Sequence, residues 1–156
     1  INCTKKMADA LDISSAFGVE TIERIEESMN NRDSLMVIID DAFWIIDAHL
    51  KDNGQDHLSA LIMTGGWIEG LYLGTKVLDR EQPDEELMKR IAAQKVSLLS
   101  LMDLLITYEN SEVMAVEREM KAIQTAFNKV DEKEIDSAVI FEISDAVSQV
   151  RAKIIR

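Results

Sequence analysis

Glycine spacing within one apolar stretch constrains the fold of this chain more than any other feature. Four of its six glycines fall within residues 64–74, TGGWIEGLYLG, and Gly66, Gly70 and Gly74 recur every fourth residue. That spacing places these three glycines along one side of a helix. Because glycine inside a helix costs about 1 kcal/mol relative to alanine, we expect the bare stripe to serve close packing. We predict that a neighbouring helix crosses at Gly70, where Gly70→Leu would overpack the crossing and destabilise the fold.

The glycines belong to a longer apolar segment. Residues 58–78 carry only Glu69 and Lys76 as charges. The length would suit a membrane span, but the neighbouring segments are charged and amphipathic, and a bundle needs a buried helix at its centre. We therefore predict a central, Gly-rich interior helix over residues 56–78 and no transmembrane segment in this chain.

Composition and periodicity favour helices along the whole chain. There is one proline, and alanine, leucine, glutamate and lysine are abundant. Asn30-Asn31 and Asn110-Ser111 are each expected to supply an N-cap, and residues 51–54, KDNG, are expected to act as a helix stop signal. Short loops between long helices favour an all-α, up-and-down bundle of about seven helices in a single domain, residues 1–156. The helices are expected at residues 2–11, 19–29, 33–52, 56–78, 83–108, 111–130 and 137–155.

Charge and cysteine content exclude some classes of partner. The formal net charge is −12, so a nucleic acid or an anionic membrane surface would be repelled. Cys3 is the only cysteine, which excludes a disulfide within the chain. Neither property identifies a substrate.

Glu69 is the strongest candidate for a functional side chain, because a carboxylate in an apolar helix must be paired, protonated or open to water. One interpretation is a ligand contact or general base in a pocket walled by Trp67 and Tyr72, with Gly66 and Gly70 beside it. The other interpretation, which we favour, is a structural role: Glu69 is hydrogen-bonded to a neighbouring helix or lies at a helix-packing margin. The glycines lack the Gly-Lys-Ser/Thr ending of a phosphate loop, and we predict no cofactor and no catalytic residue.

An acidic row occupies the third predicted helix. Asp33, Asp40 and Asp47 recur every seven residues, and Trp44 lies on the same side. Aspartates two turns apart are separated by about 10 Å, too far for one cation to bridge. The row is therefore interpreted as a solvated face. Trp44 either marks a partner surface or, as we expect, lies partly buried at the margin of the core.

His49 and His57 are the only histidines. No Glu-x-x-His pair and no zinc-ligand spacing occurs, so no metal site is predicted. Residues 48–54, AHLKDNG, resemble the His-x-x-Lys-Gly motif of histidine phosphotransfer bundles. Here the lysine comes two residues after His49 and the glycine five after, at a helix end. Phosphotransfer is accordingly the weakest of three functional hypotheses.

Residues 65–72, GGWIEGLY, together with IERIEE at 22–27 and NRDSL at 31–35, resemble a family of uncharacterised helical lipoproteins exported by Gram-negative bacteria. The resemblance implies an all-helical fold and a periplasmic or lipid-anchored place in the cell envelope. It also implies that this chain is the C-terminal part of a longer exported protein. It supplies no activity and no catalytic residues.

These observations favour a non-enzymatic envelope module that binds a protein or small-molecule partner. The alternative is a small-ligand receptor or enzyme with a pocket around Glu69, Trp67 and Tyr72. A closed core near Glu69 favours the first function, and a polar cavity there favours the second.

Overall fold

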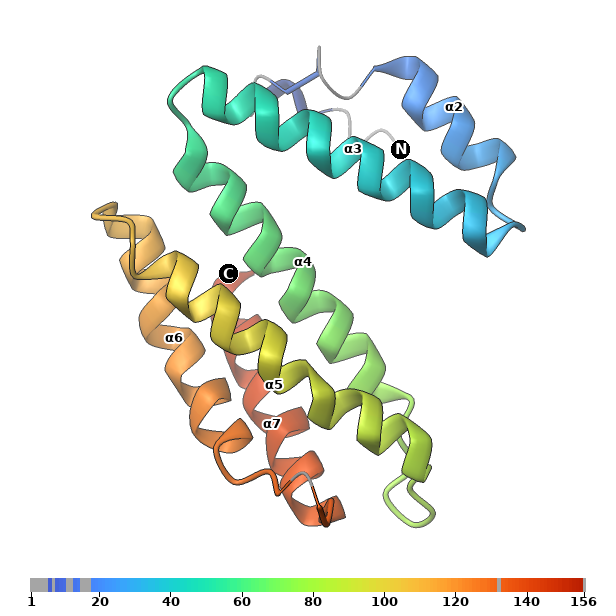
Figure 1. Cartoon of the computed structure of the whole chain (residues 1–156), viewed down its shortest axis with the longest axis vertical. Helices are drawn as coiled ribbons and strands as arrows, with labels where there is room; N and C mark the ends of the chain where they lie inside the picture. The colour runs from blue at the N-terminus through green and yellow to red at the C-terminus, as the bar shows by residue number, and fades with distance from the viewer. Residues whose placement is uncertain (1–5, 7, 11–12, 15–17, 132, 156) are drawn as a thin grey trace. The chain divides into compact units, whose positions relative to one another are not determined.

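The computed structural model is all-helical (Figure 1), which confirms the predicted fold class. It describes residues 6, 8–10, 13–14, 18–131 and 133–155. Within these residues there is no strand, and the six long or medium helices are α2 (Val19–Glu27), α3 (Arg32–Asp52), α4 (Asp56–Lys76), α5 (Glu85–Leu105), α6 (Ser111–Phe127) and α7 (Ser137–Ile154). Residues 6 and 8–10 are also helical, whereas the rest of the helix expected at 2–11 lies outside the described residues.

Side-chain caps fix several helix starts. The side chain of Asn31 accepts a hydrogen bond from the Ser34 amide at 3.1 Å, and that of Asn110 accepts one from the Glu112 amide at 2.8 Å. The N-cap expected at Asn30-Asn31 is Asn31, and the one expected at Asn110-Ser111 is Asn110. α5 begins two residues later than expected, because Asp84 is its N-cap and accepts from the Leu87 amide at 2.7 Å.

The end of α3 is a Schellman turn. Gly54 has a positive φ of 69°, which only glycine adopts without strain. The amide of Gly54 donates to the carbonyl of Lys51 at 3.0 Å, and the amide of Gln55 donates to that of Leu50 at 2.8 Å. This pattern satisfies carbonyls that the helix end would otherwise leave unpaired. The predicted stop signal at Gly54 is therefore confirmed.

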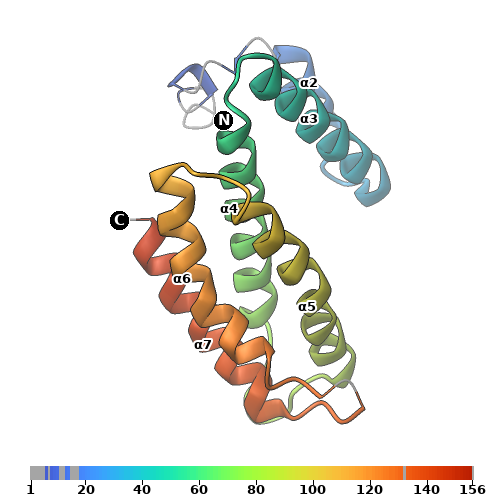
Figure 2. The same ribbon diagram turned by 60° about the vertical axis from the view of Figure 1, so that its left-hand side comes forward.

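Contacts within the chain form two compact units, residues 1–59 and residues 60–156. In the first unit, α2 and α3 lie side by side as a helical hairpin (Figures 1 and 2), and Arg24 pairs with Asp41 across it at 3.8 Å. The buried apolar residues of α3 are Ile38, Ala42 and Leu50. The prediction of a single domain over the whole chain stays a prediction.

In the second unit, α4, α5, α6 and α7 alternate in direction as an up-and-down bundle (Figure 2). Its core is formed by apolar side chains spaced three and four residues apart on each helix. The largest of these fully buried side chains are Leu98, Leu105, Met120, Ile123, Phe127, Ile140 and Ile143.

α4 is buried on one side only. Ile68 and Leu71 lie in the core, whereas Met63 and Leu73 are exposed. The sequence suggested a helix covered all round. The difference arises because α4 is apolar in composition on both sides, so its periodicity does not mark which side the other helices cover. Among the described helices, none has both the length and the apolar character needed to cross a membrane.

Candidate functional site

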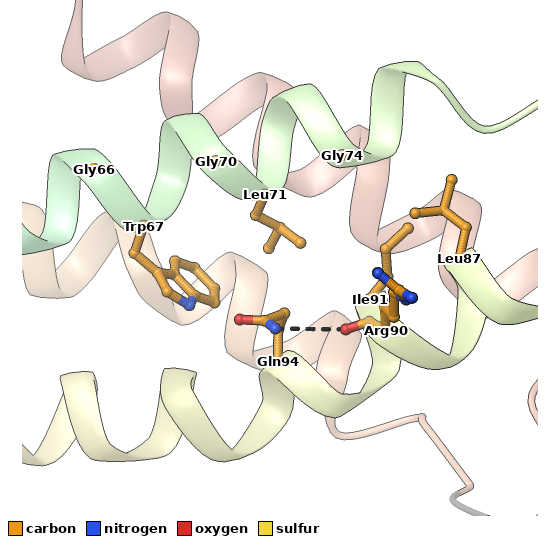
Figure 3. A pocket seen from close by; sticks show the side chains of 9 residues that line it. All are labelled: Gly66, Trp67, Gly70, Leu71, Gly74, Leu87, Arg90, Ile91 and Gln94. Atoms are coloured by element: carbon orange, nitrogen blue, oxygen red, sulfur yellow. Dashed lines mark hydrogen bonds between the residues drawn. The ribbon is translucent and has the colours of Figure 1, made fainter. Parts of the chain in front are cut away.

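A groove lies between α4 and α5 on the second unit. It has a volume of about 320 Å³ and a mainly apolar lining. Figure 3 shows Trp67 and Leu71 pointing from α4 toward α5. The residues that line it are Gly66, Trp67, Gly70, Leu71, Gly74, Leu87, Arg90, Ile91 and Gln94.

The glycines of α4 form a bare edge of this groove. A Cβ atom added at Gly70 or Gly74 would meet no heavy atom within 4 Å, and the same is true of Gly65. The predicted close crossing of another helix at Gly70 is therefore wrong. The physical reason is that the bulky Trp67 and Leu71 side chains stand between α4 and α5 and keep the two backbones apart (Figure 3).

Trp67 brings an unsatisfied donor to the groove. Its indole Nε1 is buried and has no hydrogen-bond partner among the described residues. The indole ring also packs against Phe127, with ring centroids 6.4 Å apart and a tilt of 46°. A buried N–H without an acceptor costs about 1–3 kcal/mol.

The polar side chains of α5 in the groove bind other groups of α5. The side-chain amide of Gln94 donates a hydrogen bond to the backbone carbonyl of Arg90 at 3.5 Å, as drawn in Figure 3. The Arg90 guanidinium pairs with Glu86 one turn earlier on α5. The groove thus offers apolar surface with few polar groups.

Glu69 lies on a different side of α4 and is paired with α7. Arg151 donates to its two carboxylate oxygens, from Nε at 2.5 Å and from Nη2 at 3.0 Å. The Arg151 guanidinium also lies 4.4 Å from the ring centroid of Tyr72, and Lys76 lies 5.0 Å from the same ring. This cluster ties α4 to α7, which is one of the two structural arrangements that the sequence favoured for Glu69.

The ion pair determines the electrostatics of this cluster. The hydrogen bonds that Arg151 donates lower the pKa of Glu69, and the same bonds to the Glu69 carboxylate raise the pKa of Arg151. A general base works best with a pKa near the working pH. A carboxylate with a lowered pKa is therefore a poor proton acceptor near neutral pH, and this geometry gives Glu69 a structural role.

The five predicted site residues thus divide between two places. Gly66, Trp67 and Gly70 line the groove, whereas Glu69 and Tyr72 do not and lie beside Arg151. Sequence reasoning missed the α5 side of the groove. A signal was present, because its residues follow helical spacing of three and four positions; they are Leu87, Arg90, Ile91 and Gln94.

The acidic row on α3 is partly engaged. Asp47 accepts hydrogen bonds from Lys51 at 2.7 Å and from Ser59 at 2.5 Å, and these bonds lower its pKa. Asp33 and Asp40 are exposed. Trp44 is 73% exposed, so the expectation that it lies at the core margin is wrong. Within the described part of the chain, no three His, Cys, Asp or Glu side chains gather as a metal site.

His49 lies in the last turn of α3. Its Nε2 atom is 3.3 Å from the side-chain nitrogen of Asn53. A phosphotransfer site needs an open histidine in the middle of a helix, and His49 differs from that arrangement in both respects.

Comparisons with protein-family models, with curated proteins and with solved structures found no match for this chain. The resemblance to exported helical lipoproteins stays a prediction, as does the envelope location that it implies.

Proposed function

We propose that this chain is a non-enzymatic binding module and that the groove between α4 and α5 receives an apolar helical segment of a partner protein. The observation that carries the proposal is the open space above Gly70 and Gly74. Each glycine costs α4 about 1 kcal/mol relative to alanine. No contact of Gly70 or Gly74 within the second unit offsets that cost, which supports a surface that binds another molecule.

The dimensions and lining of the groove support a helical segment. Gly66 and Gly74 are eight residues apart, which corresponds to about 12 Å, or roughly two turns of helix. Bare glycine edges allow another helix backbone to approach closely, and Trp67, Leu71 and Ile91 supply apolar contact area. A segment with small and apolar side chains would fit this surface.

The chemistry of the lining argues against catalysis. None of the described residues that line the groove is an acid, a histidine, a cysteine or a serine. The only charged one, Arg90, is paired with Glu86. The groove therefore contains neither a nucleophile nor a general base.

A second candidate is a small apolar ligand in the same groove. The buried Trp67 N–H without a partner specifically favours a ligand that carries a carbonyl or another hydrogen-bond acceptor. The two candidates differ in their use of this donor. Trp67→Phe would weaken binding of an acceptor-bearing ligand and would leave docking of an apolar helix nearly unchanged.

Filling the groove tests the proposal. Gly70→Leu places a side chain in the open space, so we expect the affinity for the neutral apolar dye Nile red to fall at least about fivefold while the melting temperature is retained. The matched control is Gly65→Leu, on the same helix but outside the groove lining. Unchanged dye affinity in Gly70→Leu, or an equal loss in Gly65→Leu, would show that the groove is not the binding site.

We also infer a place of action from the resemblance to exported helical lipoproteins, namely the periplasmic side of the cell envelope. Fractionation of a Gram-negative host that expresses the complete gene product tests this location. Recovery of the chain in the cytosolic fraction would contradict it.

A further inference from the structure

The outer side of α3 carries a second surface that the groove does not involve. Residues seven apart lie on the same side of a helix, so α3 presents two apolar rows with an acidic row between them. The apolar rows are Met36 with Phe43 and Val37 with Trp44, and the acidic row is Asp33 with Asp40. We name these six residues the α3 outer face.

The apolar side chains of this face are unusually open to solvent. Met36, Val37, Phe43 and Trp44 are 53%, 57%, 44% and 73% exposed. Single exposed apolar residues are common on proteins, but here four large ones flank one acidic row on the same side of a helix. Such patches mark sites where another molecule is bound.

The charges around the patch define the chemistry of its occupant. Asp33 and Asp40 are exposed and make no ion pair within the described part of the chain. The adjacent helix α2 carries four glutamates and one arginine. A molecule that covers the apolar rows must also lie against this negative charge, so a basic surface is the complementary one.

We propose that the α3 outer face docks an amphipathic helix of a partner protein, in which lysine or arginine side chains accompany an apolar stripe. The apolar stripe covers Phe43 and Trp44, and the basic side chains reach Asp33 and Asp40. A second copy of this chain is a poor occupant, because its own acidic row would face this one. An anionic membrane surface is repelled for the same reason.

A designed peptide tests the proposal without knowledge of the natural partner. The probe is a labelled synthetic peptide of about 18 residues, with leucine and lysine placed at helical spacing. Its two controls are the same peptide with glutamate in place of lysine, and a lysine peptide of scrambled order. We expect fluorescence anisotropy with the whole chain to report binding of the first peptide only, and to report weaker binding as salt is added.

Two sets of variants locate the binding. Trp44→Ser and Phe43→Ser remove exposed apolar side chains, and each is expected to weaken binding about tenfold. The charge variant Asp33→Asn with Asp40→Asn is expected to weaken it about fivefold. Its matched control, Asp103→Asn with Glu109→Gln, removes two exposed charges from the second unit and is expected to bind as the unaltered chain does. Circular dichroism checks that each variant is folded. If a serine variant is unfolded, the peptide affinity of the charge variant alone tests the proposal.

Three results would overturn the proposal. The first is equal affinity for the lysine and glutamate peptides, which would exclude charge complementarity. The second is unchanged affinity in Trp44→Ser and in the charge variant, which would place binding elsewhere. The third is a dimer in sedimentation analysis that Trp44→Ser dissociates, because a second copy would then be the occupant.

Discussion

Gly54 and Gly70 are glycines for different structural reasons. Gly54 is required by its backbone, since it has a positive φ of 69° at the end of α3. Gly70 has helical backbone geometry and open space beside it. The sequence alone does not separate these two roles completely. The position of Gly54 at the end of a predicted helix indicates its role, whereas the open space beside Gly70 depends on how the neighbouring helices are arranged.

Alanine substitution should separate the two glycines. We expect Gly70→Ala to raise the free energy of unfolding by about 0.5–1 kcal/mol, because alanine is the better helix former and meets no atom there. We expect Gly54→Ala to lower it by about 1 kcal/mol, because a side chain is strained at positive φ. Urea unfolding followed by circular dichroism measures both. A lower free energy of unfolding in Gly70→Ala would instead support a close helix crossing at Gly70.

The ion pair between Glu69 and Arg151 should make stability depend on pH. Arg151 lowers the pKa of Glu69 from its ordinary 4.5 in the folded state. The contribution of the pair is therefore fully present above about pH 4.5 and is lost as the pH falls through the lowered folded-state pKa. Glu69→Gln should reduce this acid-dependent loss, measured as the difference in urea midpoint between about pH 7 and about pH 3.

A matched substitution controls for the loss of any acid. Glu119 also pairs between helices, with Lys153 at 2.5 Å through one hydrogen bond rather than two. Glu119→Gln should change the pH dependence less than Glu69→Gln does. Equal effects from the two variants would show that the bidentate geometry at Glu69 adds nothing to the pH dependence of stability.

At the level of helices, the sequence predicts which segments are helical and where they end far better than it predicts which side of each helix is buried. Cap residues act locally, so the sequence alone placed the caps at Asn30-Asn31 and Asn110-Ser111, where the structure has Asn31 and Asn110. The face of α4 that meets α5 is decided by tertiary packing. A stripe of glycines fits both a close crossing and an open groove, and the bulk of Trp67 and Leu71 selects the groove.

The cap of α6 gives a prediction at this scale. Asn110 accepts hydrogen bonds from the amides of Glu112 and Val113, at 2.8 Å and 3.2 Å. Asn110→Ala should therefore lower the free energy of unfolding by about 1 kcal/mol. Asn128→Ala, which removes the same kind of side chain from the other end of α6, should have a smaller effect. A neutral result for Asn110→Ala in urea unfolding would mean that water replaces the cap at no cost.

For the whole molecule, the two compact units differ in how well their cores are filled. Among the described residues, the large side chains that are fully buried are concentrated in residues 60–156, and Leu50 is the one in the first unit. The net charge of −12 adds repulsion throughout the chain. The sequence indicated the helices but not this unequal division, because periodicity alone does not show which helices share a core.

Unfolding should accordingly begin in the first unit. Each unit contains one tryptophan, Trp44 in the first and Trp67 in the second. The melting of the second unit can be followed by Trp67 fluorescence in Trp44→Phe. We expect part of the helical circular dichroism signal to be lost at a lower urea concentration than the Trp67 signal. Coincident transitions would instead show that the two units unfold together.

The unpaired indole N–H of Trp67 also makes the groove observable. A proton that lacks an acceptor resonates at higher field than a hydrogen-bonded one, and its burial slows exchange with water. A single resonance in a nuclear magnetic resonance spectrum would therefore move when an acceptor arrives. The natural occupant of the groove can be sought by watching that one signal, with no label attached to the protein.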